Sequence, residues 1–199
     1  ARAEGCDWDE DTCIWAAAGG GHLAVLQWAR ANGGVFTSSA CYSAAAGGHV
    51  PVLQWARANG CLWDQHVCHA AVLGGHLAVL QWARDNGYPW DPLALEWAVE
   101  NGHLAVLQWA RANGWDWDES VCAGAARGGQ LAVLQWARAN GFDWDERTCS
   151  AAAAGGHLAV LKWLRANGCP WHARACAEGA RDREHLETVA WIEAQTVDP

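Results

Sequence analysis

The chain has 199 residues, a mass of 21.4 kDa and a formal net charge of −9 at pH 7. Hydrophobic residues make up 52% of it, which is too many for a disordered segment. No stretch approaches the roughly 20 uninterrupted apolar residues that cross a bilayer. The negative charge also argues against nucleic acid as a partner, because phosphate contacts require clustered Lys and Arg.

One phrase of thirteen residues recurs along the chain. It reads GHLAVLQWARANG from Gly21 to Gly33, and versions of it begin every 27 residues, at Gly48, Gly75, Gly102, Gly129 and Gly156. A period of this length is typical of a stacked array, in which each unit contacts only its neighbours. We therefore predict a single solenoid over residues 1–199. Its repeats span about 8–33, 34–60, 61–87, 88–114, 115–141, 142–168 and 169–195, and residues 1–7 are the tail of a preceding repeat.

Each repeat opens with an aromatic residue followed by a residue that can cap a helix. The pairs are Trp8-Asp9, Trp63-Asp64, Trp90-Asp91, Trp117-Asp118 and Trp144-Asp145, with Phe36-Thr37 as a variant. Asp or Thr at this place can accept hydrogen bonds from the first backbone N–H groups of a helix. The residues that follow predict a short, Ala-rich first helix, such as Cys149–Ala154, which ends at a Gly-Gly turn.

A second helix is expected from about His22 to Asn32 and at the equivalent places. At 3.6 residues per turn, one face carries Val25, Leu26, Trp28 and Ala29. The opposite face carries Ala24, Gln27, Arg30 and Ala31. Gly33 then stops the helix, because glycine adopts the left-handed conformation without steric cost. Two helices and a turn in 27 residues leave no room for a strand pair, so we predict an all-α solenoid.

These repeats resemble the helical half of the ankyrin repeat. The resemblance rests on the pattern A-A-x-x-G-H-L-x-V-L-x-x-x-x-x-x-G, which runs from Ala44 to Gly60 and recurs over nearly the whole chain. Ankyrin repeats span about 33 residues, and the residues missing here fall where those proteins carry a β-hairpin. The link shrinks to pieces such as Cys61-Leu62-Trp63, and Arg147–Ser150 replaces the T-P-L-H signature.

The repeats look like the short, Trp-containing ankyrin-type repeat of protists and giant viruses. The resemblance implies about seven stacked helix-turn-helix repeats with shortened or absent β-hairpins. It also implies that the first helices line the concave side, the side that commonly binds protein partners in ankyrin-type stacks.

The two ends of the chain differ from its middle. Ala1–Gly5 aligns with the second-helix tail Ala29–Gly33, so at least one further repeat is expected upstream. Near the other end, Arg181–Glu184 replaces the Gly-rich turn, and Glu187 and Glu193 add charge. A C-terminal capping repeat needs this charge, because one of its faces meets water.

The nine cysteines fall into two columns of the repeat. One column contains Cys13, Cys41, Cys68, Cys122, Cys149 and Cys176, with Leu95 in place of one member, and the other contains Cys6, Cys61 and Cys169. Neighbours in a column lie roughly 10 Å apart, which exceeds the reach of a disulfide. We interpret them as small buried hydrophobes. This suits a reducing, intracellular compartment, either the cytoplasm or an organelle entered after removal of a transit peptide.

Most of the 16 tryptophans are expected in the core, in two ladders. One ladder lies on the second helices, where Trp109→Ala should cost roughly 3–5 kcal/mol, and the other precedes the first helices. Trp15, Trp97 and Trp115 fall outside both ladders and are expected to be exposed.

The histidines and acidic residues do not suggest chemistry. Successive members of the column that begins at His22 lie too far apart to share an ion, and a hydrogen bond at the turn is the better interpretation. His66 and His69 form a weak metal pair that lacks further ligands. No nucleotide-binding or nucleophile motif is present. We therefore predict no enzyme activity, no metal and no cofactor.

The repeats differ most on the exposed side of the first helix. We predict that a protein partner binds this variable surface together with Trp115. The predicted contact residues are Trp15, Tyr42, His69, Leu73, Glu96, Trp97, Glu100, Trp115 and Arg127. The alternative is neutral drift on a solvated face.

The leading hypothesis for function is a non-catalytic protein–protein interaction scaffold or adaptor. The alternative is a permanent structural or linker subunit of a larger assembly, including one attached to a membrane complex. Its motivation is the recurrence of Ala24, Gln27 and Ala31 on a face that carries little charge. A targeting arm of an enzyme is a third hypothesis. None of the three involves nucleic acid or a transmembrane segment.

Overall fold

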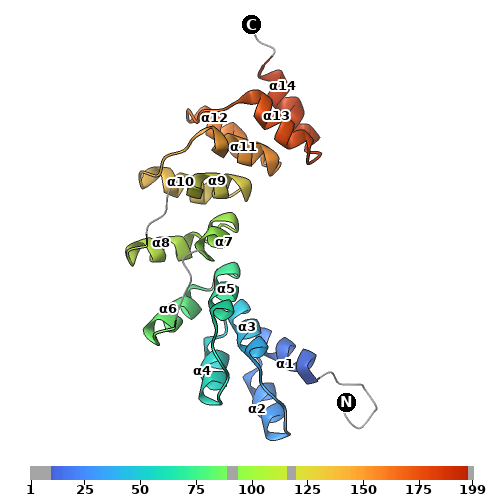
Figure 1. Ribbon diagram of the computed structural model, residues 1–199, viewed down its shortest axis with the longest axis vertical. Coiled ribbons are helices and arrows are strands. Elements are labelled where there is room, and N and C mark those ends of the chain that lie inside the picture. Colours follow the sequence, from blue (N-terminus) through green and yellow to red (C-terminus); the bar gives the residue numbers. More distant parts are fainter. Residues whose placement is uncertain (1–9, 89–93, 116–119, 197–199) are drawn as a thin grey trace. The chain divides into compact units, whose positions relative to one another are not determined.

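The computed structural model describes residues 10–88, 94–115 and 120–196 (Figure 1). These residues contain fourteen α-helices, and no strand occurs among them. The chain divides into two compact units, Ala1–Ala94 and Leu95–Pro199. The prediction of an all-α helix-turn-helix array is confirmed.

The first unit contains three helix pairs. Their bounds are α1 Glu10–Gly19 with α2 Leu23–Ala31, α3 Ser38–Ala46 with α4 Val50–Ala58, and α5 Gln65–Leu73 with α6 Leu77–Asp85. The first helices of the pairs, α1, α3 and α5, pack side by side, and each second helix packs on its own first helix.

The second unit contains four helix pairs. Their bounds are α7 Leu95–Glu100 with α8 Leu104–Ala112, α9 Ser120–Arg127 with α10 Leu131–Ala139, α11 Glu146–Ala154 with α12 Leu158–Ala166, and α13 Ala173–Arg181 with α14 Leu186–Ala194. The first helices α7, α9, α11 and α13 again pack in series.

Small side chains on the first helices and aliphatic side chains on the second helices form the core. In one pair, α9 contributes Cys122 and Ala125, and α10 contributes Val133, Leu134 and Ala137, all completely buried. Small residues let neighbouring first helices approach closely, and each buried Leu or Val stabilises the fold by about 1.5–3 kcal/mol. The interpretation of the cysteine column as buried hydrophobes holds for Cys122.

The tryptophans of the second helices lie at the edge of this core. Trp109 is half-buried and Trp28 is 51% exposed, so the expectation of a fully buried ladder is wrong. Val106, Leu107 and Ala110 take the central stripe of α8 and leave Trp109 on its flank. There the indole packs edge-on against Trp115 of the following link. Trp109→Ala should therefore cost less than the roughly 3–5 kcal/mol expected for a buried tryptophan.

The turn inside each pair carries an inter-repeat contact. Gly48 has φ 78°, and a Cβ atom there would lie 2.5 Å from Nδ1 of His76. Nε2 of His76 lies 2.8 Å from the carbonyl oxygen of Ala46. Gln130 Nε2 donates the equivalent bond to the Glu100 carbonyl at 3.0 Å, so the one substitution in the column preserves the interaction. The predicted hydrogen-bonding role of the histidine column is confirmed.

Two of the predicted helix caps make the expected bond, and a third does not. Asp64 accepts a hydrogen bond from the N–H of His66, and Asp145 accepts one from Arg147, both at 2.9 Å. Thr37 occupies the cap position of α3 without a side-chain cap bond. The predicted caps Asp9, Asp91 and Asp118 lie outside the described residues.

Candidate functional site

The first helices of unit 1 expose large apolar side chains at successive repeats. Trp15 on α1, Tyr42 on α3 and Leu73 on α5 are each 42% exposed, and His69 is half-buried. These positions belong to the variable surface that the sequence predicts. The structure therefore brings four of the nine predicted residues onto the first helices of one unit.

A shallow groove lies beside these side chains, with a volume of about 460 Å³. Its lining consists of Trp15, Ser38, Ser39, Tyr42, Ser43, Asp64 and His66. Two aromatic rings, four hydroxyl groups, one imidazole and the carboxylate of Asp64 can make apolar contacts and hydrogen bonds, and the lining contains no Lys or Arg. Helices α3 and α5 contain no charged residue at all. Apart from the carboxylate of Asp64, the groove offers an uncharged surface to a ligand.

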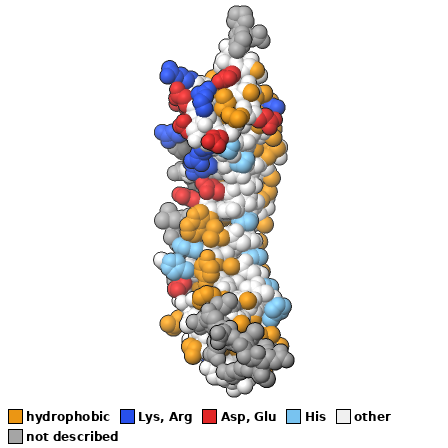
Figure 2. All heavy atoms as spheres, turned by 90° about the vertical axis from the view of Figure 1, so that its right-hand side faces the viewer, with side chains coloured by type: hydrophobic (Ala, Val, Ile, Leu, Met, Phe, Trp, Pro, Cys, Tyr) orange, Lys and Arg blue, Asp and Glu red, His pale blue; other side chains and the backbone are white. Residues whose placement is uncertain are grey.

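The equivalent surface of unit 2 is charged. Glu96 and Trp97 are exposed on α7, with Trp97 at 39%, and Arg127 Nη1 on α9 lies 2.9 Å from Glu100 Oε1. The small side chain of Ala123 leaves a hollow of about 150 Å³ between α7 and α9. Figure 2 shows Lys, Arg, Asp and Glu side chains gathered on the C-terminal part of this face. The predicted residues Glu96, Trp97, Glu100 and Arg127 therefore lie together, in chemistry unlike that of unit 1.

Trp115 does not belong to either surface. It is half-buried in the link after α8, and its ring centroid lies 5.4 Å from that of Trp109, edge to face. The prediction that it is exposed is wrong. Trp115 stands one repeat from Phe142, which packs on Trp136 with ring centroids 5.8 Å apart. That column was visible in the sequence as Cys61 and Cys169, but its aromatic members were not assigned to it.

The arginine column has a role that sequence reasoning missed. Arg138 lies with its guanidinium carbon 4.3 Å from the Trp144 ring centroid and donates to the Phe142 carbonyl at 2.7 Å. Arg165 lies 4.6 Å over Trp171 in the same way. Cation–π contacts at partly exposed sites contribute about 0.5–1 kcal/mol each. These arginines hold the link to the next repeat and are structural residues.

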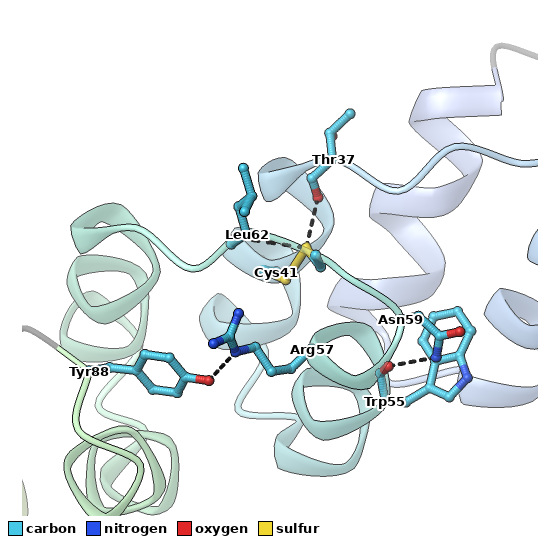
Figure 3. The surroundings of a disulfide bond; sticks show 8 residues. Thr37, Cys41, Trp55, Arg57, Asn59, Leu62 and Tyr88 are labelled. Carbon is cyan, nitrogen blue, oxygen red and sulfur yellow. Dashed lines mark hydrogen bonds between the residues drawn. A yellow bond between two sulfur atoms is a disulfide. The ribbon is translucent and has the colours of Figure 1, made fainter.

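One pair of cysteines is covalently linked. The Sγ atoms of Cys41, on α3, and Cys61, in the link after α4, form a disulfide (Figure 3). The Cα atoms are 7.1 Å apart, beyond the roughly 4.4–6.8 Å that disulfides usually span. The expectation that every cysteine is unlinked is wrong for this pair. Spacing along a column excludes bonds between members of that column, but a member of one column faces a member of the other, 20 residues further along the chain.

No metal centre emerges from the part of the chain that the structure describes. There, no group of three or more His, Cys, Asp or Glu side chains converges as a metal site would require. The rings of His66 and His69 lie 5.8 Å apart on α5, edge to face. Among the same residues, every helix is too short or too polar to cross a membrane.

Comparison with known proteins gives a fold but no close relative. No family model matches the chain, and no curated protein matches its sequence. Solved structures do match, 94 chains in all. The crystal structure of the human ASB11 ankyrin repeat domain matches with a TM-score of 0.61 over 78% of this chain and 83% of that chain. The fold is similar to that of an ankyrin repeat domain. At 20% sequence identity, the likeness concerns the fold alone.

Proposed function

We propose that this protein is a non-catalytic protein-interaction scaffold, built from short, Trp-containing ankyrin-type repeats. The observation that carries the proposal is the exposed row Trp15, Tyr42 and Leu73 on the first helices of unit 1. Caps, turns and core repeat from one pair to the next, whereas the exposed first-helix positions change. A scaffold that must hold one shape and recognise a particular partner has this distribution of constant and variable positions.

The chemistry of the row favours a protein as the partner. Tryptophan and tyrosine are enriched at the centre of protein interfaces, because they bury a large area and lose little conformational entropy. The neighbouring groove adds hydroxyl groups, Asp64 and His66 for hydrogen bonds. The lack of Lys and Arg in the groove and the net charge of −9 make a polyanion a poor ligand.

The proposal is tested by capturing partners with the full chain as bait. A double variant, Trp15→Ala with Tyr42→Ala, should lose the captured partner, because both substitutions remove exposed contact area and leave the core intact. The matched control is Val25→Ala with Val35→Ala, which are 45% and 69% exposed and lie outside the row. Equal capture by both variants would refute the assignment of the surface.

A permanent structural or linker subunit of a larger assembly is the second candidate. The observation that favours this candidate is the outer face of the second helices, where Ala105, Gln108 and Ala112 on α8 are all exposed. Such a face carries little charge and suits a broad, constant contact. Size-exclusion chromatography of the native protein distinguishes the two: a monodisperse monomer favours the scaffold, and a complex that resists salt favours the subunit.

A further inference from the structure

A second pair of cysteines occupies the register of the disulfide, four repeats further along the chain. Cys149 lies on the first helix α11 and Cys169 in the link after α12, as Cys41 lies on α3 and Cys61 in the link after α4. In both repeats the two residues are 20 positions apart. Repeats of one period place equivalent residues in equivalent surroundings. The two thiols of the second pair are therefore expected to face each other.

The local contacts of the two pairs agree. Cys61 Sγ lies 3.3 Å from the carbonyl oxygen of Thr37, the residue that caps α3. Cys169 Sγ lies 3.5 Å from the carbonyl oxygen of Asp145, which caps α11. In each repeat the helix cysteine follows the cap residue by one helical turn. This shared contact anchors the link cysteine at the same place relative to the first helix.

The two thiols of the second pair differ in acidity. The hydrogen bond between them raises the pKa of Cys149, which burial raises further. The same hydrogen bond lowers the pKa of Cys169, burial opposes this change, and nearby Arg165 adds to it. Cys169 is thus the sulfur that deprotonates first, and Cys149 is the hydrogen-bond donor. Because the thiolate is the nucleophile in thiol–disulfide exchange, Cys169 is the attacking group.

Other repeats cannot form such a pair. Where the first column has Cys68 or Cys122, the second column has Tyr88 or Phe142. Cys122 is completely buried like Cys149, but the residue 20 positions after it is Phe142 in place of a cysteine. It is therefore a natural internal control for the reactivity of a buried cysteine in this fold.

We propose that Cys149 and Cys169 are a redox-active dithiol that forms a disulfide between α11 and the link after α12 by exchange with a low-molecular-weight disulfide such as oxidised glutathione. The Cys169 thiolate attacks one sulfur of the small disulfide and expels one small thiolate. Cys149 gives its proton to that thiolate and attacks the Cys169 sulfur, and the second small thiolate leaves and takes a proton from water. Two protein thiols are oxidised, and one small disulfide is reduced to two thiols.

Burial controls the rate of this exchange. Both sulfurs belong to completely buried residues, so the small disulfide reaches Cys169 only when the link around it opens. The product closes a loop that contains the whole of α12. A cross-link of this length restricts the unfolded chain, and oxidation should raise the Tm of the transition by about 5–10 °C.

The test uses the full-length, folded chain in buffers of increasing oxidised-to-reduced glutathione ratio. After acid quenching and alkylation, peptide mass spectrometry measures the fraction of Cys149 linked to Cys169. We expect this linked peptide to accumulate while Cys122 remains alkylated as a thiol. Equal alkylation of Cys149, Cys169 and Cys122 at every ratio would overturn the proposal, and so would a link from Cys149 to Cys122 or Cys176.

A gain-of-function variant tests the register independently. Phe142→Cys supplies the missing thiol opposite Cys122, and the new residue should become linked to Cys122 under the same oxidising conditions. The control is Phe142→Ser, which makes the same loss of the aromatic ring without a thiol and should leave Cys122 unlinked. If the chain is folded but the introduced thiol is recovered fully alkylated, the two columns do not face each other and the proposal fails.

Discussion

Nε2 of His49 lies 2.9 Å from the carbonyl oxygen of Gly19, the last residue of the preceding first helix. This contact joins two repeats through one side chain, and His76 repeats it towards Ala46. A carbonyl at a helix end has no partner within its own helix, so the imidazole supplies the hydrogen bond that the helix cannot. The histidines of this array are thus inter-repeat connectors.

Replacing the connector tests its contribution. His49→Ala should lower the free energy of unfolding by about 1–1.5 kcal/mol, because the Gly19 carbonyl loses its partner. His49→Gln should restore most of the loss, since Gln130 makes the same bond in unit 2. Urea denaturation of the three proteins measures the difference. If Gln and Ala variants were equally unstable, ring packing and not the hydrogen bond would be the dominant contribution.

Two glycines with nearly equal backbone angles separate conformational strain from crowding. Gly129 has φ 73°, and a Cβ atom there would lie 2.6 Å from Nδ1 of His157. Gly141 has φ 83°, and no atom lies within 4 Å of its Cβ position. Gly141→Ala should cost about 1 kcal/mol from the left-handed conformation alone. Gly129→Ala should cost about 1–3 kcal/mol more, because the imidazole must also move.

Equal costs for the two glycine substitutions, measured by thermal unfolding, would mean that the His157 ring moves aside freely. The inter-repeat contact would then have little structural importance. A larger loss at Gly129 would show that the ring and the glycine are fitted to each other.

The edge-on contact of Trp109 with Trp115 should be measurable as a coupling. Trp109→Ala should cost about 2 kcal/mol, below the usual range for a buried tryptophan, because the indole is only half-buried. A double-mutant cycle with Trp115→Ala should give a coupling energy of about 0.5–1.5 kcal/mol. Additive losses would show that the two rings do not stabilise each other.

Stability should fall at alkaline pH through buried thiols. Burial raises the pKa of the Cys122 thiol to about 11, from an ordinary value of 9.0. Between these values the folded chain keeps a proton that the unfolded chain loses. The contribution of Cys122 is therefore complete below pH 9 and is lost as the pH rises through 11, with about 2 kcal/mol of it lost by pH 11.

The matched variant for this effect is Cys122→Ala. Its unfolding free energy should change less between pH 8 and pH 11 than that of the parent chain, whatever its stability at pH 8. Urea denaturation at both pH values measures the change. An unaltered pH dependence would show that Cys122 does not titrate differently in the two states.

The sequence predicts the repeating part of this fold well, because that part is local. A 27-residue period, a cap such as Asp145 and a stop such as Gly33 each act within one or two helical turns. The hydrogen-bonding role of the histidine column was also predictable, because its members lie too far apart to share an ion. That each bond reaches the preceding repeat is known only from the structure. The alignment of the repeats therefore predicts most of the helix boundaries.

Contacts between columns were harder to predict. Cys61 follows Cys41 by most of a repeat, and only the path of the intervening helix pair shows that the two face each other. Comparison with the other tryptophans alone predicts that Trp115 is exposed, whereas its equivalents in the repeat are Cys61 and Phe142. The half-burial of Trp109 also depends on where the link returns across the helix, which helical periodicity does not specify.

The first-helix surface of unit 1 is the proposed binding site for a protein partner. The most direct test places a photo-crosslinking phenylalanine derivative at Tyr42, on α3, and in a parallel protein at Gln54, an exposed position on α4. Each protein is irradiated in an extract of its own cells, and the adducts are identified by mass spectrometry. We predict a specific adduct from position 42 and none from position 54. Adducts from position 54 alone would contradict the account and would favour the outer face of the second helices as the interface.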